Sequence, residues 1–345
     1  MPSKQQTKPF LAITMGDPAG IGPEIIVKAL QLPKVLRICR PLVIGSHTIL
    51  EQTARSLGSP LALGPGERYE ASSHIRIFRK DHLSVLDPFP NPVQPVRSGR
   101  GTARSGNMAV TCIQTAVQLA HTGYVHGIVT APINKHAMYL AGHLYPGHTE
   151  MLADLTKAKE SGMMIVGGPL KISFATTHLA LREVPNVLTS ANILRAIRLA
   201  HQGLTQLFHI QNPRIGVAGL NPHAGENGLF GNEERRLIQP AIRQAQKQGI
   251  SCTGPHPADT LFGRALRGGF DGCVAMYHDQ GLIPLKTVAF GHCVNITVGL
   301  PIIRTSVDHG TAYDIAGKGK ADSTSLVDAI ALAARLVKQT TGPRV

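Results

Sequence analysis

Short apolar runs rich in β-branched residues alternate with segments in which apolar residues recur every three to four positions. The apolar runs predict strands over residues 11–15, 41–45, 127–131, 163–167, 171–177, 214–220, 272–277 and 295–299. Amphipathic helices are predicted after Ser105 and after Thr189, where apolar residues share one helical face. Strands that alternate with helices predict an α/β fold with a largely parallel sheet.

Length and composition limit the class of protein. The 345 residues are enough for one large domain or two smaller ones, and 43% apolar residues can form a substantial core. No apolar run is long enough to cross a bilayer, and "MPSKQQTKPF" lacks the apolar centre of a signal peptide, so we expect a soluble, cytoplasmic protein without a membrane partner. The five cysteines lie far apart, which argues against disulfides and a cysteine-built zinc site.

The formal net charge of +14 raises the question of a nucleic-acid partner. Aromatic residues make up only 4% of the chain, tryptophan is absent, and the basic residues are scattered. The densest basic group, Arg97, Arg100 and Arg104, lies in a Gly/Ser-rich stretch typical of a solvated loop. Attraction of small anionic ligands is the second interpretation of the charge, and we expect no nucleic-acid partner.

Three histidines come at or just after the ends of predicted strands. His178 ends "KISFATTH", His223 ends "RIGVAGLNPH", and His278 follows "GCVAMY". In open α/β sheets ligands bind beyond the carboxyl ends of strands, and three imidazoles on a divalent metal leave a position open for substrate. Asp279 could be a fourth ligand, or it could orient a ligand by a hydrogen bond.

Chance places some of the 16 histidines at strand ends, where a single histidine is more often structural. Three in the same context, each within two residues of Asn, Asp or Thr, favour a metal site over that explanation. A metal-dependent hydrolase would show the same pattern, so the histidines alone leave the reaction open.

A second polar group, in "YPGHTEMLADL", places His148 and Thr149 between a glycine and a helical pattern. Thr149 can cap that helix, in which case the group is only structural. The functional alternative is an anion bound at the helix N-terminus, with His148 and Thr149 as donors. Lys286, Asn295 and Arg304 flank the last predicted strand and add the cationic and amide donors that a phosphate or carboxylate needs.

Two glycine-rich stretches are candidates for a nucleotide site. "GDPAGIGPE", Gly16 to Glu24, lacks the G-x-G-x-x-G spacing, and a tight turn with Pro23 at the first helical position explains much of it. "SVDHGTAYDIAGKGKAD" carries Asp314 and is placed after the last predicted strand, where its glycines alone would fit a connection with tight turns. By spacing alone the dinucleotide signal is weak.

Several long strings together resemble one enzyme family. They are "GDPAGIGPE", "GHTE", "TTHLALREVP", "GLNPHAGENGLFG", "GPHPADTLF", "MYHDQGLIPLK" and "VNITVGLPIIRTSVDHGTAYDIAGKGKAD", and they span residues 16 to 322. On these strings the chain resembles the 4-hydroxythreonine-4-phosphate dehydrogenase family of pyridoxine biosynthesis. "GDPAGIGPE" and "HGTAYDIAGKGKAD" also resemble the isocitrate and isopropylmalate dehydrogenase group, whose nucleotide site departs from the Rossmann fingerprint.

The resemblance implies two α/β/α domains of the isocitrate/isopropylmalate dehydrogenase type, with the active site in the cleft between them. We expect residues 1–140 plus 290–345 to form a nucleotide-side domain that contains both termini. Residues 141–289 are expected to form a central domain with the metal-site and dimerisation elements. The resemblance further implies a homodimer that shares the active site and its metal.

The resemblance also implies a role for each candidate residue. One divalent metal, Zn²⁺, Mg²⁺ or Co²⁺, would bind to His178, His223 and His278. The substrate would contact His148, Thr149, Lys286, Asn295 and Arg304. NAD or NADP would contact Asp314 and Gly310. Candidates for the proton acceptor are Lys286, Asp279 and a metal-bound hydroxide.

The implied reaction is the metal-dependent, NAD(P)-linked oxidation of 4-phosphooxy-L-threonine at C3 to 2-amino-3-oxo-4-phosphooxybutanoate. That β-keto acid decarboxylates to 3-amino-2-oxopropyl phosphate, a step toward pyridoxal phosphate. Close relatives oxidise 4-phosphorylated D-threonate or D-erythronate, which are the alternative substrates. A hydrolase, or an anion-binding module without chemistry, would need no loop such as "HGTAYDIAGKGKAD".

Overall fold

The computed structural model describes residues 8–64, 67–68, 82–91, 94 and 96–341. It divides into two compact units, of which the first contains Met1–Lys157 with Pro301–Thr341 and the second contains Ala158–Leu300. Most of the N-terminal segment that we expect not to be a signal peptide lies in residues 1–7, outside the described residues.

The junctions between the units differ from the boundaries expected after residues 140 and 289. Helix α6 (His148–Thr156) packs against α4 (Ala103–His121), which places it in the first unit. Strand β11 (Val294–Val298) pairs with β6 (Gly162–Gly167), which places it in the second. Both relations join segments far apart in sequence, so the pattern along the chain does not locate these junctions.

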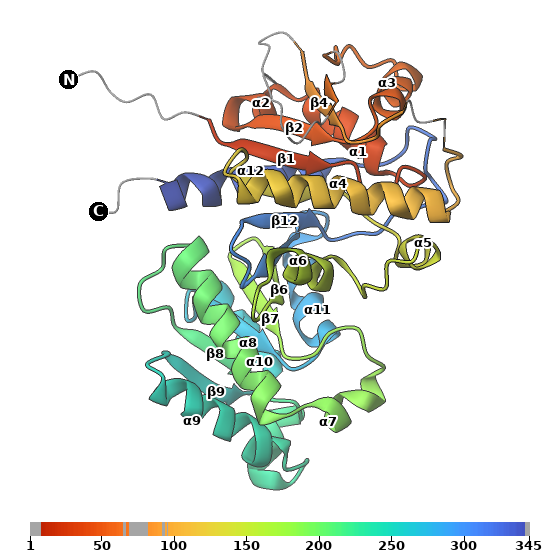
Figure 1. The fold of residues 1–345 in the computed structure, drawn as a ribbon. Coiled ribbons are helices and arrows are strands. Elements are labelled where there is room, and N and C mark those ends of the chain that lie inside the picture. The colour runs from red at the N-terminus through yellow and green to blue at the C-terminus, as the bar shows by residue number, and fades with distance from the viewer. Residues whose placement is uncertain (1–7, 65–66, 69–81, 92–93, 95, 342–345) are drawn as a thin grey trace, which may run out of the picture. The chain divides into compact units, whose positions relative to one another are not determined.

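The first unit is built on a parallel sheet whose described strands run in the order β3-β4-β2-β1-β5-β12. Figure 1 labels β4, β2, β1 and β12 of this sheet. These strands are Phe10–Thr14 (β1), Arg40–Ile44 (β2), Glu67–Arg68 (β3), Ser84–Asp87 (β4), Gly127–Thr130 (β5) and Arg304–Val307 (β12). Besides α4 and α6, its helices are Gly22–Leu30 (α1), Pro33–Ile38 (α2), His47–Ser56 (α3), Lys135–Leu140 (α5) and Thr324–Thr341 (α12).

Local sequence explains the best-defined elements of this unit. The residues of β1 from Leu11 to Ile13 have no exposed surface, as expected for a central strand of a parallel sheet that is covered on both faces. Helix α4 begins with a capping box in which Thr102 and Ser105 exchange hydrogen bonds. The helix predicted after Ser105 is therefore confirmed.

The second unit has the strand order β11-β6-β7-β10-β8-β9, in which β7, β10, β8 and β9 are parallel and β6 is antiparallel to both neighbours. Figure 1 labels β6, β7, β8 and β9 of this sheet. The strands not yet named are Leu170–Phe174 (β7), Ile215–Ala218 (β8), Cys252–His256 (β9) and Gly272–Ala275 (β10). The helices are Leu181–Glu183 (η1), Val184–Val187 (α7), Ser190–Gln202 (α8), Gly203–Leu207 (η2), Pro222–Gly228 (η3), Glu234–Ile238 (η4), Gln239–Lys247 (α9), Ala258–Leu266 (α10) and His278–Ala289 (α11). Helix α8 confirms the helix predicted after Thr189.

All eight predicted strands are present, and the largely parallel α/β fold is confirmed. The pattern missed β3, β4, β9 and β12. The last omission requires a correction, because the loop 308–322 follows β12 and not the strand predicted over 295–299.

Three simpler expectations also hold. All five cysteines are free and buried, as small core residues are. Arg97, Arg100 and Arg104 are exposed, the first two in a loop and Arg104 in the first turn of α4. No helix in the described part of the chain is both long and apolar enough to cross a membrane.

Candidate active site

Two of the three strand-end histidines lie next to each other. Strands β7 and β10 are parallel neighbours, so their carboxyl ends meet at one edge of the second unit's sheet. The ring centroids of His178 and His278, which follow those ends, are 5.6 Å apart with 43° between the ring planes. Two imidazoles bound to one tetrahedral zinc at about 2.0–2.1 Å place their centroids about 5 Å apart. The pair therefore has the spacing of two ligands of one metal.

Asp279 fixes the orientation of the His278 ring. Its Oδ1 lies 2.6 Å from Nδ1 of His278, and because an ionised carboxylate can only accept, Nδ1 carries the proton and Nε2 is left to bind a metal. Asp279 also lies in the first turn of α11, where the helix dipole stabilises a negative charge. These contacts favour the orienting role of Asp279 over that of a fourth ligand.

His223 reaches the same sheet edge through a left-handed turn. Strand β8 is the other parallel neighbour of β10, and beyond it φ is positive at each residue from His223 to Asn227. Each non-glycine residue in this conformation costs about 1–2 kcal/mol, so the turn must be held by its surroundings. Within the described residues, no three His, Cys, Asp or Glu side chains are grouped closely enough to hold a metal. The structure forms the His178–His278 pair, and the part of His223 in the site stays a prediction.

A buried carboxylate holds the left-handed turn. Glu234 is 3% exposed, and its Oε1 accepts hydrogen bonds from the backbone N–H groups of Leu220 (2.9 Å) and Asn221 (2.8 Å). Its Oε2 accepts from Nδ2 of Asn221 at 3.0 Å. Gly225 has φ +82°, and a Cβ there would lie 2.7 Å from Oε2 of Glu234, so glycine allows this approach. Sequence reasoning missed Glu234 because a glutamate in an amphipathic segment is ordinarily a surface residue.

In the first unit, the position of Arg304 differs from the one predicted. The strand pattern placed it beside a strand, but it is the first residue of β12 and is 1% exposed. Its Nη2 donates a hydrogen bond to Oγ1 of Thr130 on β5 at 2.6 Å. Burial lowers the pKa of Arg304 to about 9, which leaves the guanidinium charged at pH 7. Burying a cation costs free energy that an anion beside it would offset.

His148 lies near this cation as a neutral ring. Burial, followed by the positive charges of Arg304 and Lys135, holds the pKa of His148 well below its usual range. Its Nε2 is buried and has no hydrogen-bond partner in the structure. Helix α6 begins at His148 after Gly147 and has no side-chain cap, so Thr149 does not cap it. Donors at the N-terminus of a helix, close to a buried cation, suit an anionic ligand.

Lys286 and Asn295 belong to the second unit. Lys286 is half-buried in the last turn of α11, two helical turns after His278. Asn295 is half-buried in β11, and its Oδ1 is buried without a hydrogen-bond partner. Because buried polar atoms in folded proteins are almost always satisfied, this oxygen suits a ligand that donates a hydrogen bond.

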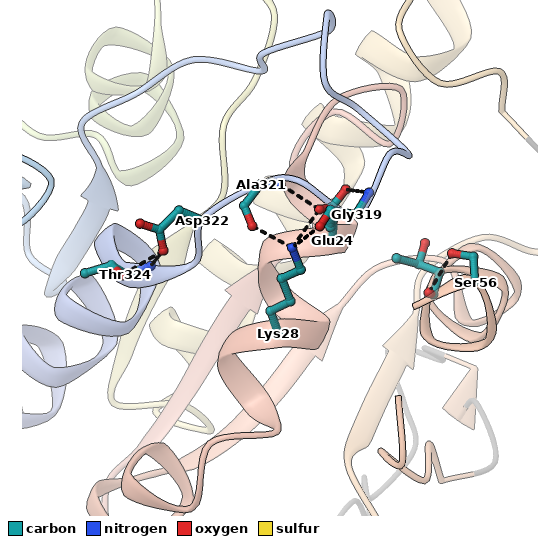
Figure 2. A network of polar contacts seen from close by, with 8 residues as sticks. Glu24, Lys28, Ser56, Gly319, Ala321, Asp322 and Thr324 are labelled. Carbon is teal, nitrogen blue, oxygen red and sulfur yellow. Dashed lines mark hydrogen bonds and ion pairs between the residues drawn. The ribbon is translucent and has the colours of Figure 1, made fainter. Parts of the chain in front are cut away.

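The glycine-rich loop 308–322 is fastened to α1 of the same unit (Figure 2). The carboxylate of Glu24 accepts hydrogen bonds from the N–H groups of Ala321 (2.8 Å) and Gly319 (3.3 Å). Nζ of Lys28 donates to the carbonyls of the same two residues at 2.7 and 2.8 Å, and also to Glu24 at 2.9 Å. One acid and one amine thus satisfy both backbone groups of two loop residues, which fixes the conformation of this part of the loop.

The stretch "GDPAGIG" supports the other end of the loop. The hydroxyl of Tyr313 donates to Oδ2 of Asp17 at 2.6 Å, and the N–H of Ile21 donates to the carbonyl of Thr311 at 3.0 Å. A Cβ on Gly20 would lie 2.8 Å from the Thr311 carbonyl oxygen, so only glycine permits this approach. A supporting role for this stretch agrees with its lack of the dinucleotide-binding glycine spacing.

Asp314 and Gly310 are exposed on this loop. Each is adjacent to an anchored residue, since Asp314 follows Tyr313 and Gly310 precedes Thr311. Their backbone is therefore held while their surfaces stay accessible to a ligand. Their contact with a cofactor stays a prediction.

Comparisons with known proteins identify the family of this chain. The family model described as "Pyridoxal phosphate biosynthetic protein PdxA" matches residues 37–333. The chain belongs to this family. A relative from Desulfosudis oleivorans, named 4-hydroxythreonine-4-phosphate dehydrogenase, is 48% identical over 94% of this chain and 95% of its own length. A relative from Cupriavidus necator, named D-threonate 4-phosphate dehydrogenase, is 48% identical over 95% of this chain and 97% of its own.

A crystal structure of 4-hydroxythreonine-4-phosphate dehydrogenase from Klebsiella pneumoniae matches with a TM-score of 0.84 and 42% identity over 96% of this chain and 98% of that one. Membership of the PdxA family confirms the resemblance seen in the sequence strings. It also identifies the chain as a dehydrogenase, which excludes the hydrolase and the anion-binding module.

The contacts of Glu24 and Lys28 with loop 308–322 lead to a prediction for this PdxA family member. Lys28→Met keeps the aliphatic stem but removes the donor to Gly319 and Ala321, so the loop loses part of its order. We expect KM for the dinucleotide to rise about tenfold, equivalent to about 1.4 kcal/mol, with substrate KM unchanged. Steady-state kinetics with each reactant varied in turn measures both values. Lys34→Met, at an exposed position of α2, is the matched control. An unchanged dinucleotide KM in Lys28→Met would argue against this loop as the cofactor site.

Proposed function

We propose that the chain is a metal-dependent, NAD(P)-linked dehydrogenase that oxidises 4-phosphooxy-L-threonine at C3. The resulting β-keto acid, 2-amino-3-oxo-4-phosphooxybutanoate, loses CO₂ to give 3-amino-2-oxopropyl phosphate. The observation that carries this proposal is the 48% identity, along nearly the full length of both chains, to a protein named 4-hydroxythreonine-4-phosphate dehydrogenase. Formation of reduced nicotinamide with release of an equal amount of CO₂ tests the reaction, and oxidation without CO₂ release would speak against it.

The alternative substrate class is 4-phosphorylated D-threonate or D-erythronate. It is favoured by the equal identity, 48%, of the relative named D-threonate 4-phosphate dehydrogenase. The threonine and threonate phosphates both carry a phosphate and a carboxylate, so an anion site would not separate them. They differ at C2, where one carries an amine and the other a hydroxyl, and the residues that face C2 would decide between them.

The residues proposed to contact the substrate are His148, Thr149, Lys286, Asn295 and Arg304. A buried guanidinium at Arg304 and a neutral His148 with an unsatisfied Nε2 support contacts with the substrate's anionic groups. The unsatisfied Oδ1 of Asn295 supports a contact with the substrate's amine or hydroxyl, from which it would accept a hydrogen bond.

His178, His223 and His278 would hold the metal. Three imidazoles suit Zn²⁺ or Co²⁺ better than Mg²⁺, which prefers oxygen ligands. When bound, such an ion supplies a Lewis acid that lowers the pKa of the substrate's C3 hydroxyl.

Asp279 already accepts a hydrogen bond from Nδ1 of His278, so of the two candidate side chains Lys286 is assigned to accept the hydroxyl proton at Nζ. Bound NAD(P) would take up the hydride that leaves C3 as that proton is removed. A Lys286→Met variant that keeps the parental kcat would take Lys286 out of this role.

Asp314 is expected to give a preference for NAD over NADP. A carboxylate beside the adenosine ribose accepts hydrogen bonds from its hydroxyls and repels a 2′-phosphate. The exposed Lys318 and Lys320 soften this preference by attracting phosphate. We expect the ratio of kcat/KM for NAD to that for NADP to fall at least about fivefold in Asp314→Ala, because two charges about 4 Å apart in water interact by about 1 kcal/mol. A parent enzyme that prefers NADP, or an unchanged ratio in the variant, would show that Asp314 does not contact the ribose.

The enzyme is further proposed to be a cytoplasmic homodimer without a nucleic-acid partner. Large apolar side chains are exposed on α11, with Phe290 just after its end: Ile283 is 64% exposed, Val288 44% and Phe290 80%. Exposed apolar patches of this kind are typical of association surfaces. Sedimentation at micromolar concentration tests whether the enzyme is a dimer, and a monomer at that concentration would contradict the proposed homodimer.

A further inference from the structure

A buried amide joins the strand ends that carry His278 and His223. Gln280 is 8% exposed, and its Oε1 accepts a hydrogen bond from the backbone N–H of Met276 at 2.6 Å. Its Nε2 donates to the carbonyl of Gly219 at 2.6 Å. Met276 directly follows β10, and Gly219 directly follows β8. One side chain therefore links the ends of two neighbouring strands.

The bond to Met276 has an ordinary explanation, but the bond to Gly219 does not. Gln280 is the third residue of α11, and an amide at that position commonly reaches back to the backbone before the helix. Helix capping does not require the second bond, which reaches a different strand. A cap alone would leave Nε2 of Gln280 free to point to solvent, whereas it is committed to Gly219.

The link continues on both sides of Gln280. Oγ1 of Thr176, two residues before His178, donates to the carbonyl of Met276 at 2.7 Å. On the other side, Glu234 accepts hydrogen bonds from Leu220 and Asn221, which lead into the left-handed turn of His223. The three histidine-bearing strand ends are thus linked by these hydrogen bonds and the short backbone segments between them, with Gln280 at the centre.

We propose that Gln280 is a positioning residue that holds the turn of His223 in register with the His178–His278 pair, so that the three imidazoles can bind one divalent metal. This inference rests on the metal site of the proposed function. Gln280 itself does not touch the metal, and its effect passes through the backbone of Gly219 and Met276.

The test is a titration of metal-free protein with Co²⁺, followed by the visible absorption band of the bound ion. Gln280→Met keeps the volume and removes both hydrogen bonds. We expect Co²⁺ to bind about 10–100-fold more weakly, as is typical when a group that supports a metal ligand is lost. Gln246→Met is the matched control, because Gln246 also donates from Nε2 to a backbone carbonyl in the second unit, that of Cys252 at 2.8 Å. It should leave Co²⁺ affinity unchanged even if both variants lower the melting temperature of the metal-free protein.

A second variant covers the case in which Gln280→Met does not fold. Glu234→Gln places a donor where Asn221 Nδ2 now has an acceptor, which disturbs the turn of His223 from its other side. This variant should also bind Co²⁺ at least about tenfold more weakly. Parental Co²⁺ affinity in a folded Gln280→Met or Glu234→Gln protein, or an equal loss in Gln246→Met, would overturn the proposal. His278→Ala separates the two claims, because parental Co²⁺ binding in that variant would remove the metal site itself.

Discussion

Alanine in place of His178, His223 or His278 is expected to remove the bound metal and abolish turnover. The binding free energy of a structural zinc ion is about 10–16 kcal/mol, shared by four ligands. Loss of one imidazole should therefore weaken metal binding about a hundredfold. Metal content after dialysis, together with dehydrogenase turnover, measures both effects. His201→Ala, in the last turn of α8 of the same unit, is the control and should keep metal and activity.

His223 provides the sharpest form of this prediction. The pairing of His178 with His278 is visible in the structure, whereas the place of His223 in the site is inferred from its strand end. If a His223→Ala enzyme kept stoichiometric metal and full activity, His223 would not be a metal ligand and the site would have two histidine ligands. The same result for His178→Ala or His278→Ala would contradict the proposed metal site as a whole.

Arg304→Lys is expected to lower kcat/KM for the phosphorylated substrate by about 1–3 kcal/mol, roughly 5–150-fold. Lysine keeps the charge but loses the planar fork that bonds two oxygens at once. Because Arg304 is 1% exposed, water cannot readily replace the lost contact. Kinetics with the substrate varied measures the effect, and Arg37→Lys, at an exposed position of α2, should leave kcat/KM at the parental value.

A phosphate-free analogue provides the complementary result. If Arg304, His148 and Thr149 bind the substrate's anionic groups, the analogue should be a much poorer substrate of the parent enzyme. Equal use of the phosphorylated and phosphate-free compounds would contradict the assignment of these residues.

Residues in strongly periodic segments could be predicted from the sequence. The eight apolar runs and the helices α4 and α8 follow from local patterns, and His178, His223 and His278 were found because each stands next to such a run. Strand β12 was missed because "RTSV" begins with a charge and contains two hydroxyl residues, so only its pairing with β5 reveals it.

The supporting residues could not be predicted, because their roles depend on contacts across long stretches of chain. Gln280 acts on Gly219, and Lys28 acts on Gly319 and Ala321, which are far away in sequence. The burial of Arg304 likewise depends on the packing of β12 against β5 and α12, which come from other parts of the chain. A local pattern indicates where chemistry-bearing residues leave a strand, but not which side chains hold them there.

The most direct test of the proposed activity is a parallel measurement of kcat/KM for 4-phosphooxy-L-threonine and 4-phospho-D-threonate. The metal-loaded enzyme is supplied with NAD, and the absorbance of the reduced nicotinamide is followed. We predict the higher value for 4-phosphooxy-L-threonine, because it is the substrate of the proposed function. A higher value for 4-phospho-D-threonate, or no reduced nicotinamide from 4-phosphooxy-L-threonine, would contradict the proposed function.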